Sequence, residues 1–512
     1  MKPRKLMAGI ISIACIFFIF AGCGKSSSDV VNLIPEDASA AVIIPNVGAT
    51  SGHVGEFIDW LTTQVPMLAM FKQQMSLVTG VDLTKAENLA TKGIDPKGSA
   101  AVAALDPSGN KMTVLVPVKD EKAFVAFLNE MIRKKGGAEL RKEGDNYTLP
   151  DGGVMSIKKG FAIMCENSDT IAKITGKGKS LASNPDYKRI SKALGNSGDL
   201  IFYFSKKMME VVPGPEAQEA AKLAKGFGAL GGTLNISAKE ISAKMFATIA
   251  DTGNMKKLLS GTGESSLLES MPGPAPILAR FNVNVPELWN YIKANVIASD
   301  PETKRQFEQG MTAMKASMNL DMEADVIANI AGDPIVVLYG MTGRKKDTPD
   351  IVITMVVKNE AKIRDAVSKI SQMAGARKTP KDLKGMGVTV LSSPGGAYYI
   401  AVAKNNIVMT ATPDRMKQVL GVLSGATSGQ TAVGSVKHEE AKKLLQNKKS
   451  SVAYLSVFEL LNSYRSSLSR GEQAMMDAYM TQAKGLANSY IIMTFSMEEG
   501  GVVSAFSLRF GG

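Results

Sequence analysis

Histidine is the side chain best suited to proton transfer near neutral pH, and the chain contains two, His53 and His438. Neither stands in a His-Glu-x-x-His or similar spacing, which would place two metal-binding imidazoles on one face of a helix. We therefore interpret both as histidines of loops or of the surface. The sequence predicts no metal site.

Two short motifs match catalytic or binding sequences only in part. Gly178-Lys179-Ser180 is similar to the end of a phosphate-binding loop, but Lys173 stands where the first glycine is required to arrange the backbone amides around phosphate. Ser156 and Lys159 have the Ser-x-x-Lys spacing of penicillin-recognising enzymes, yet the partner motifs are missing. We interpret both matches as coincidences.

The chain has three cysteines, Cys15, Cys23 and Cys165. The first two belong to an N-terminal segment considered below, so no intramolecular disulfide is available to the folded body. Cys165 lies in an apolar stretch that predicts a strand. We interpret it as a small buried residue rather than as a reactive thiol.

Methionine and tryptophan offer two further candidates. Met311, Met314, Met318 and Met322 recur at helical spacing, which could form a thioether surface for copper(I) or a pliable groove for apolar ligands. The interpretation that we prefer is a packed helix face. Trp60 and Trp289 could form a carbohydrate or peptide platform, but we expect each to anchor a core at the start of a helix.

These candidates do not combine into a nucleophile, a base and an orienting group. The sequence therefore predicts a protein that is not an enzyme. It predicts no catalytic residue, no cofactor and no metal ligand.

The N-terminus has the three-part layout of an export signal. Lys2, Arg4 and Lys5 precede an apolar stretch, 6–20, which is followed by Ala21-Gly22-Cys23. Small residues directly before a cysteine resemble the lipobox of bacterial lipoproteins, which implies cleavage after residue 22 and lipidation of Cys23. The alternative is an uncleaved anchor, because the apolar stretch approaches the roughly 17 to 25 residues that span a bilayer.

An exported lipoprotein would lie in the cell envelope. Gly24 directly after the cysteine resembles the pattern of lipoproteins released to the outer membrane, so we expect the protein on the periplasmic face of that membrane.

Removal of residues 1–22 takes away three positive charges and lowers the formal net charge from +12 to +9. The lysines are scattered and predict a solvated surface, although association with anionic lipid or a cell-wall polymer stays open. No basic motif with interleaved aromatic residues predicts binding of nucleic acid.

Internal repetition is the main feature of the rest of the chain, because five landmarks recur in the same order. Their separation grows from 237 residues, between Ile34 and Met271, to 259 residues, between Ala224 and Ala483. Such growth is expected of a duplication that has gained loop insertions. The pairs are Ile34-Pro35 with Met271-Pro272 (each leading to a tryptophan), Val118-Lys119 with Val357-Lys358, Gly152-Gly153 with Gly395-Gly396, Tyr203 with Tyr454, and Ala224-Lys225-Gly226 with Ala483-Lys484-Gly485.

The duplication predicts how the chain is divided. We expect a signal peptide over 1–22, a polar tether over 23–32, a first repeat domain over 33–252, a linker over 253–267 and a second repeat domain over 268–512.

Each predicted domain mixes strands and helices. The stretches 112–118 and 351–357 are short, apolar and β-branched, as in buried strands, and 237–249 and 494–510 alternate around turn residues, as in hairpins. The stretches 122–135, 361–374 and 471–486 are amphipathic and predict helices. Hairpins mixed with helices predict an α+β fold, in which a mainly antiparallel sheet packs with amphipathic helices.

The segment Ile34-Pro35-Glu36-Asp37-Ala38, which leads into an apolar strand behind a lipobox, resembles uncharacterised bacterial envelope lipoproteins with α+β repeats. The resemblance implies an envelope location and supplies no site residues. We expect a membrane-anchored protein with a binding or scaffolding role. The alternatives are a periplasmic carrier of a hydrophobic ligand, which needs an apolar cavity, and an envelope hydrolase.

Overall fold

The computed structural model describes residues 28–64, 82–195, 197–210, 227–249, 252–261, 267–295, 297–341, 349–373, 377–383, 386–393, 396–426, 429–465, 468–482 and 488–511. The chain forms two compact units. The first unit comprises residues 1–250 and 498–507, and the second comprises 251–497 and 508–512.

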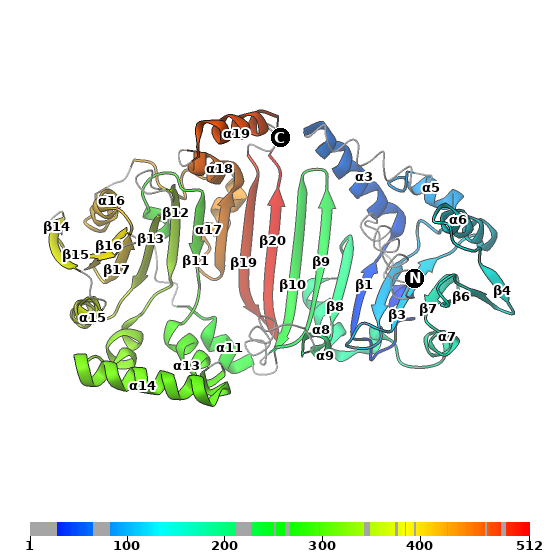
Figure 1. The fold of residues 1–512 in the computed structure, drawn as a ribbon, viewed down its shortest axis with the longest axis horizontal. Coiled ribbons are helices and arrows are strands. Elements are labelled where there is room, and N and C mark those ends of the chain that lie inside the picture. The colour runs from blue at the N-terminus through cyan, green and yellow to red at the C-terminus, as the bar shows by residue number, and fades with distance from the viewer. Residues whose placement is uncertain are drawn as a thin grey trace. The chain divides into compact units, whose positions relative to one another are not determined.

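The first unit contains an antiparallel sheet in which β1 is central and pairs with β2 and β8 (Figure 1). From β2 the pairing continues through β3, β7, β6 and β5 to β4, and from β8 it continues through β9 to β10. The bounds are β1 Ala40–Ile44, β2 Ala100–Ala104, β3 Met112–Pro117, β4 Arg141–Glu143, β5 Asn146–Thr148, β6 Val154–Lys158, β7 Phe161–Cys165, β8 Leu200–Phe204, β9 Phe227–Ser237 and β10 Glu240–Ile249.

The second unit repeats this order of pairing. Its central strand β11 pairs with β12 and β18, and the sheet continues through β13, β17, β16 and β15 to β14 on one side and to β19 on the other. The bounds are β11 Ile277–Arg280, β12 Ile335–Met341, β13 Pro349–Val356, β14 Arg377–Leu383, β15 Met386–Ser393, β16 Gly396–Ala403, β17 Asn406–Thr410, β18 Ser451–Ser456 and β19 Tyr490–Glu498. The last strand, β20 Gly501–Arg509, belongs mostly to the first unit, which includes residues 498–507.

Helices connect the strands of both units. In the first unit they are α2 Ser28–Val31, α3 Val47–Gln64, α5 Ala86–Thr91, α6 Glu121–Lys134, α7 Ser168–Thr175, η2 Leu181–Ser183, α8 Pro185–Leu194 and α9 Lys206–Glu210. In the second unit they are α11 Thr252–Leu258, α12 Leu267–Ser270, α13 Val285–Asn295, η4 Ile297–Ser299, α14 Pro301–Met318, η5 Met322–Val326, η6 Ile327–Asn329, α15 Glu360–Met373, α16 Pro413–Leu423, α17 Glu439–Gln446, α18 Val457–Arg465 and α19 Arg470–Gln482.

The predicted α+β class with antiparallel sheets is therefore confirmed. The predicted strands 112–118 and 351–357 correspond to β3 and β13, and the predicted helices 122–135 and 361–374 correspond to α6 and α15. Their ends follow from local chemistry. Asp120, for example, caps α6 because its carboxylate accepts a hydrogen bond from the Ala123 N–H.

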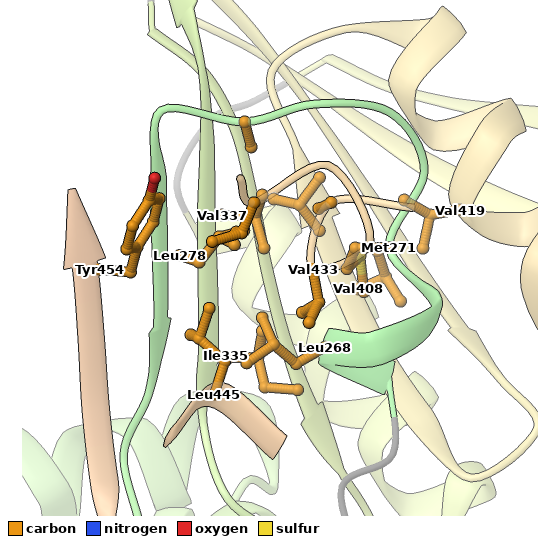
Figure 2. Packing of buried hydrophobic residues seen from close by; sticks show 14 of the residues in the cluster. Leu268, Met271, Leu278, Ile335, Val337, Val408, Val419, Val433, Leu445 and Tyr454 are labelled. Carbon is orange, nitrogen blue, oxygen red and sulfur yellow. The ribbon is translucent and has the colours of Figure 1, made fainter. Parts of the chain in front are cut away.

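The main core of each unit lies on one face of its sheet, which we call the closed face. In the second unit α16, α17 and the segment around Val433 cover this face, and their side chains meet those of β11, β12 and β17 (Figure 2). Leu278, Ile335 and Val337 of the two central strands have no exposed surface. Burial of this kind stabilises a fold by roughly 1.5 to 3 kcal/mol for each large aliphatic side chain.

Two segments outside the predicted repeat domains belong to the folded body. Val30 and Val31 of α2, which fall within the predicted tether, pack in the core of the first unit. Residues 253–258, which fall within the predicted linker, are helical, and Met255 and Leu258 are buried there. Among the described residues no helix is both long and apolar enough to cross a bilayer. The predicted signal peptide and Cys23 lie outside the described residues.

Candidate functional site

His53 lies in α3 and not in a loop, and it forms the one histidine–carboxylate contact among the described residues. Its Nδ1 is 3.1 Å from Oδ1 of Asp199, a side chain with 1% exposure. The second oxygen of Asp199 accepts a hydrogen bond from the Ile236 N–H. This geometry fixes the imidazole and could support proton transfer. The neighbouring hydroxyl of Ser51 donates to the Leu83 carbonyl, so it is not placed as a nucleophile for His53.

We expect Asp199 to act mainly in stability. Asp199→Ala leaves the Ile236 N–H without its carboxylate acceptor and should lower the free energy of unfolding by about 1 to 3 kcal/mol. His53→Ala removes a half-exposed partner and should cost less than about 1 kcal/mol. Urea unfolding of both variants measures the difference. Equal losses would show that the imidazole contact, and not the backbone hydrogen bond, is the important one.

His438 occupies the N-cap position of α17 without a capping hydrogen bond from its side chain, and its ring stacks on Tyr490 with the ring centroids 4.1 Å apart. Burial lowers the pKa of His438, whereas its contact with the Asn488 carbonyl raises it in part. Glu459, in the first turn of α18, is also affected, because burial raises the pKa of its carboxyl and the nearby Lys437 lowers it in part. No contact among the described residues brings His438 or Glu459 together with a nucleophilic side chain.

The raised pKa of Glu459 has a definite effect on stability. Between the ordinary pKa of 4.5 and the raised folded value, the folded state binds more protons than the unfolded state, so stability falls as pH rises through this range. Glu459→Gln removes this loss and should raise the melting temperature at pH 7. The gain should disappear below pH 4.5, where the carboxyl is protonated in both states. Thermal unfolding at pH 7 and pH 4 checks the sign, and an equal gain at both values would contradict it.

The partial motifs do not assemble into sites. Ser156 is fully buried in β6 and donates to the Asp145 carbonyl, whereas Lys159 lies in the following turn and donates to the Thr175 carbonyl at the end of α7. Lys173 forms an ion pair with Asp37 at 2.9 Å. Cys165 is buried as predicted, and burial raises the pKa of its thiol.

Met311, Met314 and Met318 lie on α14 and Met322 begins η5; all four are half-buried, whereas the other residues of α14 except Phe307 are exposed. The tryptophan prediction is wrong about depth. Trp60 and Trp289 are half-buried too, and Trp60 lies near the end of α3 rather than at its start. Trp289 Nε1 donates to Glu323, which also accepts from Lys293. These aromatic side chains therefore sit at the edge of the fold.

A buried charge that the sequence did not point to occurs in the second unit. Arg280, at the end of β11, is 1% exposed and donates to the carbonyls of Leu445 and Asn447 at the end of α17. Burial lowers the pKa of Arg280, and the fully buried carboxylate of Asp333 partly offsets this. The guanidinium thus satisfies carbonyls that every helix C-terminus leaves unpaired.

The second unit has another feature of functional interest, which is the face of its sheet opposite the closed face. We call it the open face. Cross-strand pairing brings its side chains into two rows. The first row is Ile491, Leu455, Ile277, Leu338 and Ile351, and the second is Met493, Ala453, Ala279, Val336, Ile353, Met409 and Ile400.

Every side chain of the two rows is aliphatic or a thioether. Ala279 is buried, Met493 is exposed and the other ten are half-buried. Met493 is 48% exposed, and Phe495, which follows on the same face of β19, is 36% exposed. An antiparallel sheet with one face in the core ordinarily carries polar side chains on the other. Apolar side chains left exposed together on one surface mark sites of ligand, membrane or protein binding.

The two rows lack hydrogen-bonding side chains, although Thr389, Tyr398 and Ser451 lie on the same face beyond them. Among the described residues, buried polar atoms without a hydrogen-bond partner include Tyr339 Oη and Thr354 Oγ1, which lie on the closed face. Neither row contains a polar side chain. Whatever covers the rows gains burial of apolar surface and no polar contact from these side chains.

The corresponding face of the first unit is filled more fully. There α6 contributes Phe124, Phe127 and Met131 to a second core cluster, which also contains Ile44 and Ala100 of the sheet. In the second unit the equivalent helix is α15, and its Ile363 forms a small cluster with Val357 and Val402. The Val-Lys landmarks before the two helices align Phe124 with Ile363 and Phe127 with Ala366. Smaller side chains on the covering helix leave more of the sheet exposed.

Sequence reasoning missed the open face although a signal was present. The segment from Ile335 to Leu338 is apolar at consecutive positions, and so is the segment from Ile351 to Ile353. Such runs predict strands that are apolar on both faces. They indicate strands that are buried on both faces. Only the folded structure shows that the side chains on one of the two faces are incompletely covered.

Comparisons with known proteins give a family without an assigned function. A family model described as "Protein of unknown function (DUF3352)" matches residues 98–339, which is less than half of the chain. No curated protein matches the chain. Among solved structures the chain is similar to crystal form I of TP0453, with TM-score 0.25, 9% identity, and coverage of 45% of this chain and 82% of that chain. Crystal form IV gives TM-score 0.26 and 11% identity over 43% of this chain and 79% of that chain, and form III gives 0.26 and 10% over 43% and 80%.

Proposed function

We propose that this protein is a lipid-anchored protein of the bacterial cell envelope, without enzymatic activity, that binds an apolar ligand on the open face of its second unit. The N-terminal segment with its lipobox-like Ala21-Gly22-Cys23 supports export, cleavage after residue 22 and lipidation of Cys23. The proposed location is the periplasmic face of the outer membrane. The partner proposed at the N-terminus is the membrane itself, and nucleic acid is not a partner.

We also propose that the two units arose by duplication of one domain. The five landmarks in the sequence support this, and so does the identical order of strand pairing around β1 and β11. Local contacts repeat as well. Pro35 bridges Ser180 in the first unit, and Pro272 bridges Thr431 in the second. A duplicated domain can diverge in one copy, and the open face is where the second copy differs.

The observation that carries the proposal is the pair of apolar rows on the open face, in which Met493 is exposed and most of the other side chains are half-buried. Burying apolar surface gains roughly 25 cal/mol for each Å² removed from water. Side chains such as Met493 and Leu338 therefore favour association with an apolar molecule over contact with water. Methionine suits this role because its unbranched thioether adapts to ligands of different shape.

Native mass spectrometry of the full chain, released from detergent in the gas phase, tests for the ligand. We expect an apolar small molecule to remain bound to the wild-type protein. Ala453→Phe should reduce its occupancy at least fivefold, because the added ring fills the second row beside Met493 and Ala279. Ala316→Phe, at an exposed position of α14, is the matched control and should retain the ligand. Absence of any apolar adduct from the wild-type protein would overturn the binding function.

The anchor has its own test. Cells fed with an alkyne analogue of palmitate should label the wild-type chain, and Cys23→Ser should lose the label and accumulate as an uncleaved precursor. Labelling that persists in Cys23→Ser would contradict lipidation at this residue.

A further inference from the structure

The folded body of the first unit begins close to the proposed lipid anchor. Ser28, where α2 starts, follows Cys23 by five positions. An extended chain spans at most about 3.6 Å per residue, so the start of α2 lies within about 18 Å of the lipidated residue. Lipidation of Cys23 would therefore hold the region of the first unit around α2 near the membrane surface.

The loop after α7, residues 176–180, is fixed beside this N-terminal segment. The Glu36 N–H donates to the Lys179 carbonyl at 3.1 Å. Just beyond the loop, the Leu181 N–H donates to the Ile34 carbonyl at 2.7 Å. The helix α2 also packs against η2, which directly follows the loop. The loop therefore belongs to the region that the anchor would hold near the membrane.

Three lysines gather at this loop, and we call them the lysine cluster. Lys177 and Lys179 belong to the loop itself and are exposed. Lys159 is exposed in the turn between β6 and β7, and its Nζ donates to the carbonyl of Thr175, the last residue of α7, at 3.0 Å. A Cβ at Gly178 would meet no described atom within 4 Å, so the loop projects into open space.

The neighbouring acidic residues do not neutralise the lysine cluster. Asp37 forms an ion pair with Lys173 at 2.9 Å, and Asp29 of α2 is matched in number by Lys25 of the tether. Glu36 is then the one remaining carboxylate on the N-terminal segment. No ion pair among the described residues involves a lysine of the cluster. The region around the loop therefore has an excess of positive charge.

The second unit, which has no anchor of its own, has the same loop contact without the lysines. The Gly273 N–H donates to the Gln430 carbonyl at 2.8 Å, which is the counterpart of the bond that the Lys179 carbonyl accepts. Counting back two positions aligns Lys177 with Ser428. The two units share the backbone contact but not the charges. The two loop lysines are therefore not needed to form the loop.

We propose, on the basis of the proposed lipidation of Cys23, that the lysine cluster binds the anionic phospholipid headgroups of the leaflet that holds the anchor. The negative potential of such a leaflet strengthens binding by about fivefold for each lysine close to its surface. This attraction falls off within a Debye length, about 8 Å at physiological ionic strength. The anchor brings the cluster within that range, and the cluster sets which side of the first unit faces the lipid.

Co-sedimentation of the mature chain with vesicles tests the cluster without the anchor, when the chain starts at residue 23 and carries Cys23→Ser. We expect this parent chain to bind vesicles of phosphatidylcholine that contain about one third phosphatidylglycerol, and to bind pure phosphatidylcholine at least tenfold more weakly. Lys177→Ser/Lys179→Gln gives the loop the residues of the second unit and should weaken binding to the anionic vesicles at least tenfold. Lys177→Arg/Lys179→Arg keeps both charges and should bind as the parent does.

The matched control is Lys448→Ser/Lys449→Gln, which removes two charges from an exposed pair of the second unit and should weaken binding less than threefold. Equal losses in the two double variants would show that only net charge matters and would overturn the cluster. A parent chain without preference for the anionic vesicles would overturn it too. Binding to isolated peptidoglycan instead of vesicles would assign the lysines to the cell wall and overturn the membrane partner.

This experiment and the palmitate labelling of Cys23 can fail separately, because the Cys23→Ser chain carries no lipid. If Cys23 is labelled but the loop variant binds vesicles as the parent does, the lysine cluster is wrong and the anchor stands. If Cys23 takes no label but the loop variant loses binding, the cluster stands as a membrane-binding surface and the anchor is wrong.

Discussion

Replacing Arg280 by isoleucine is expected to lower the free energy of unfolding of the second unit by about 3 to 5 kcal/mol. The substitution removes the donors to the Leu445 and Asn447 carbonyls. It also leaves the carboxylate of Asp333, which is fully buried, without the neighbouring positive charge. Denaturant unfolding, with hydrogen exchange at the amides of β11 and α17, measures the loss and assigns it to this unit.

The first unit suggests a second substitution that should restore part of the stability lost in Arg280→Ile. By strand pairing, Ala41 and Ala103 correspond to Leu278 and Val337, which makes Ile43 the counterpart of Arg280 and Ser99 the counterpart of Asp333. The double variant Arg280→Ile/Asp333→Ser reproduces that combination and should recover at least about half of the stability lost, because no buried charge remains. Arg305→Ala, at an exposed ion pair, should change stability by less than about 1 kcal/mol. A double variant no more stable than Arg280→Ile would show that the helix carbonyls, rather than Asp333, dominate.

Introducing a charge at Val503 should unfold the first unit, although this residue is near the C-terminus of the chain. Residues 498–507 belong to the first unit, where Val503 is 5% exposed and packs in the same cluster as Phe246 and Ile190. Val503→Asp buries a carboxylate without a partner and should cost at least about 3 kcal/mol, whereas Val503→Ala should cost about 2 kcal/mol.

Hydrogen exchange in α8 and β10 reports on this prediction, since both elements lie in the first unit. The adjacent Ser504 is half-buried, and Ser504→Asp is the control that should change exchange there only slightly. Gly501 gives a second probe of the same strand, because a Cβ at this position would clash with the Ala247 carbonyl oxygen. Unchanged exchange in α8 and β10 for Val503→Asp would show that the C-terminal strand is not required by the first unit.

The elements of the fold that could be predicted from the sequence are those set by local periodicity. The apolar β-branched run 112–118 and the amphipathic run 122–135 correspond closely to β3 and α6. His53 shows the limit of this approach, since it was interpreted as a loop or surface residue and its partner Asp199 is 146 residues away. A contact over that distance has no signal in local sequence.

The buried pair of Arg280 and Asp333 was missed for a related reason. An isolated arginine at the end of an apolar strand is typical of a surface position, because arginine is almost never fully buried unless it is paired. Its burial depends on the carbonyls at the end of α17, whose position relative to β11 follows only from the folded sheet. The open face differs from this pair. The sequence shows the apolar runs of its strands, but it does not show that no helix covers them fully.

The most direct test of the account is methionine oxidation footprinting of the full chain, before and after extraction of its bound ligand. Met493 lies on the open face and Met475 lies on α19 outside the two rows, and their exposures are 48% and 58%. We expect Met493 to oxidise at least fivefold more slowly when the ligand is present, and Met475 to oxidise at the same rate in both samples. Equal oxidation of Met493 with and without the ligand would contradict apolar binding on the open face.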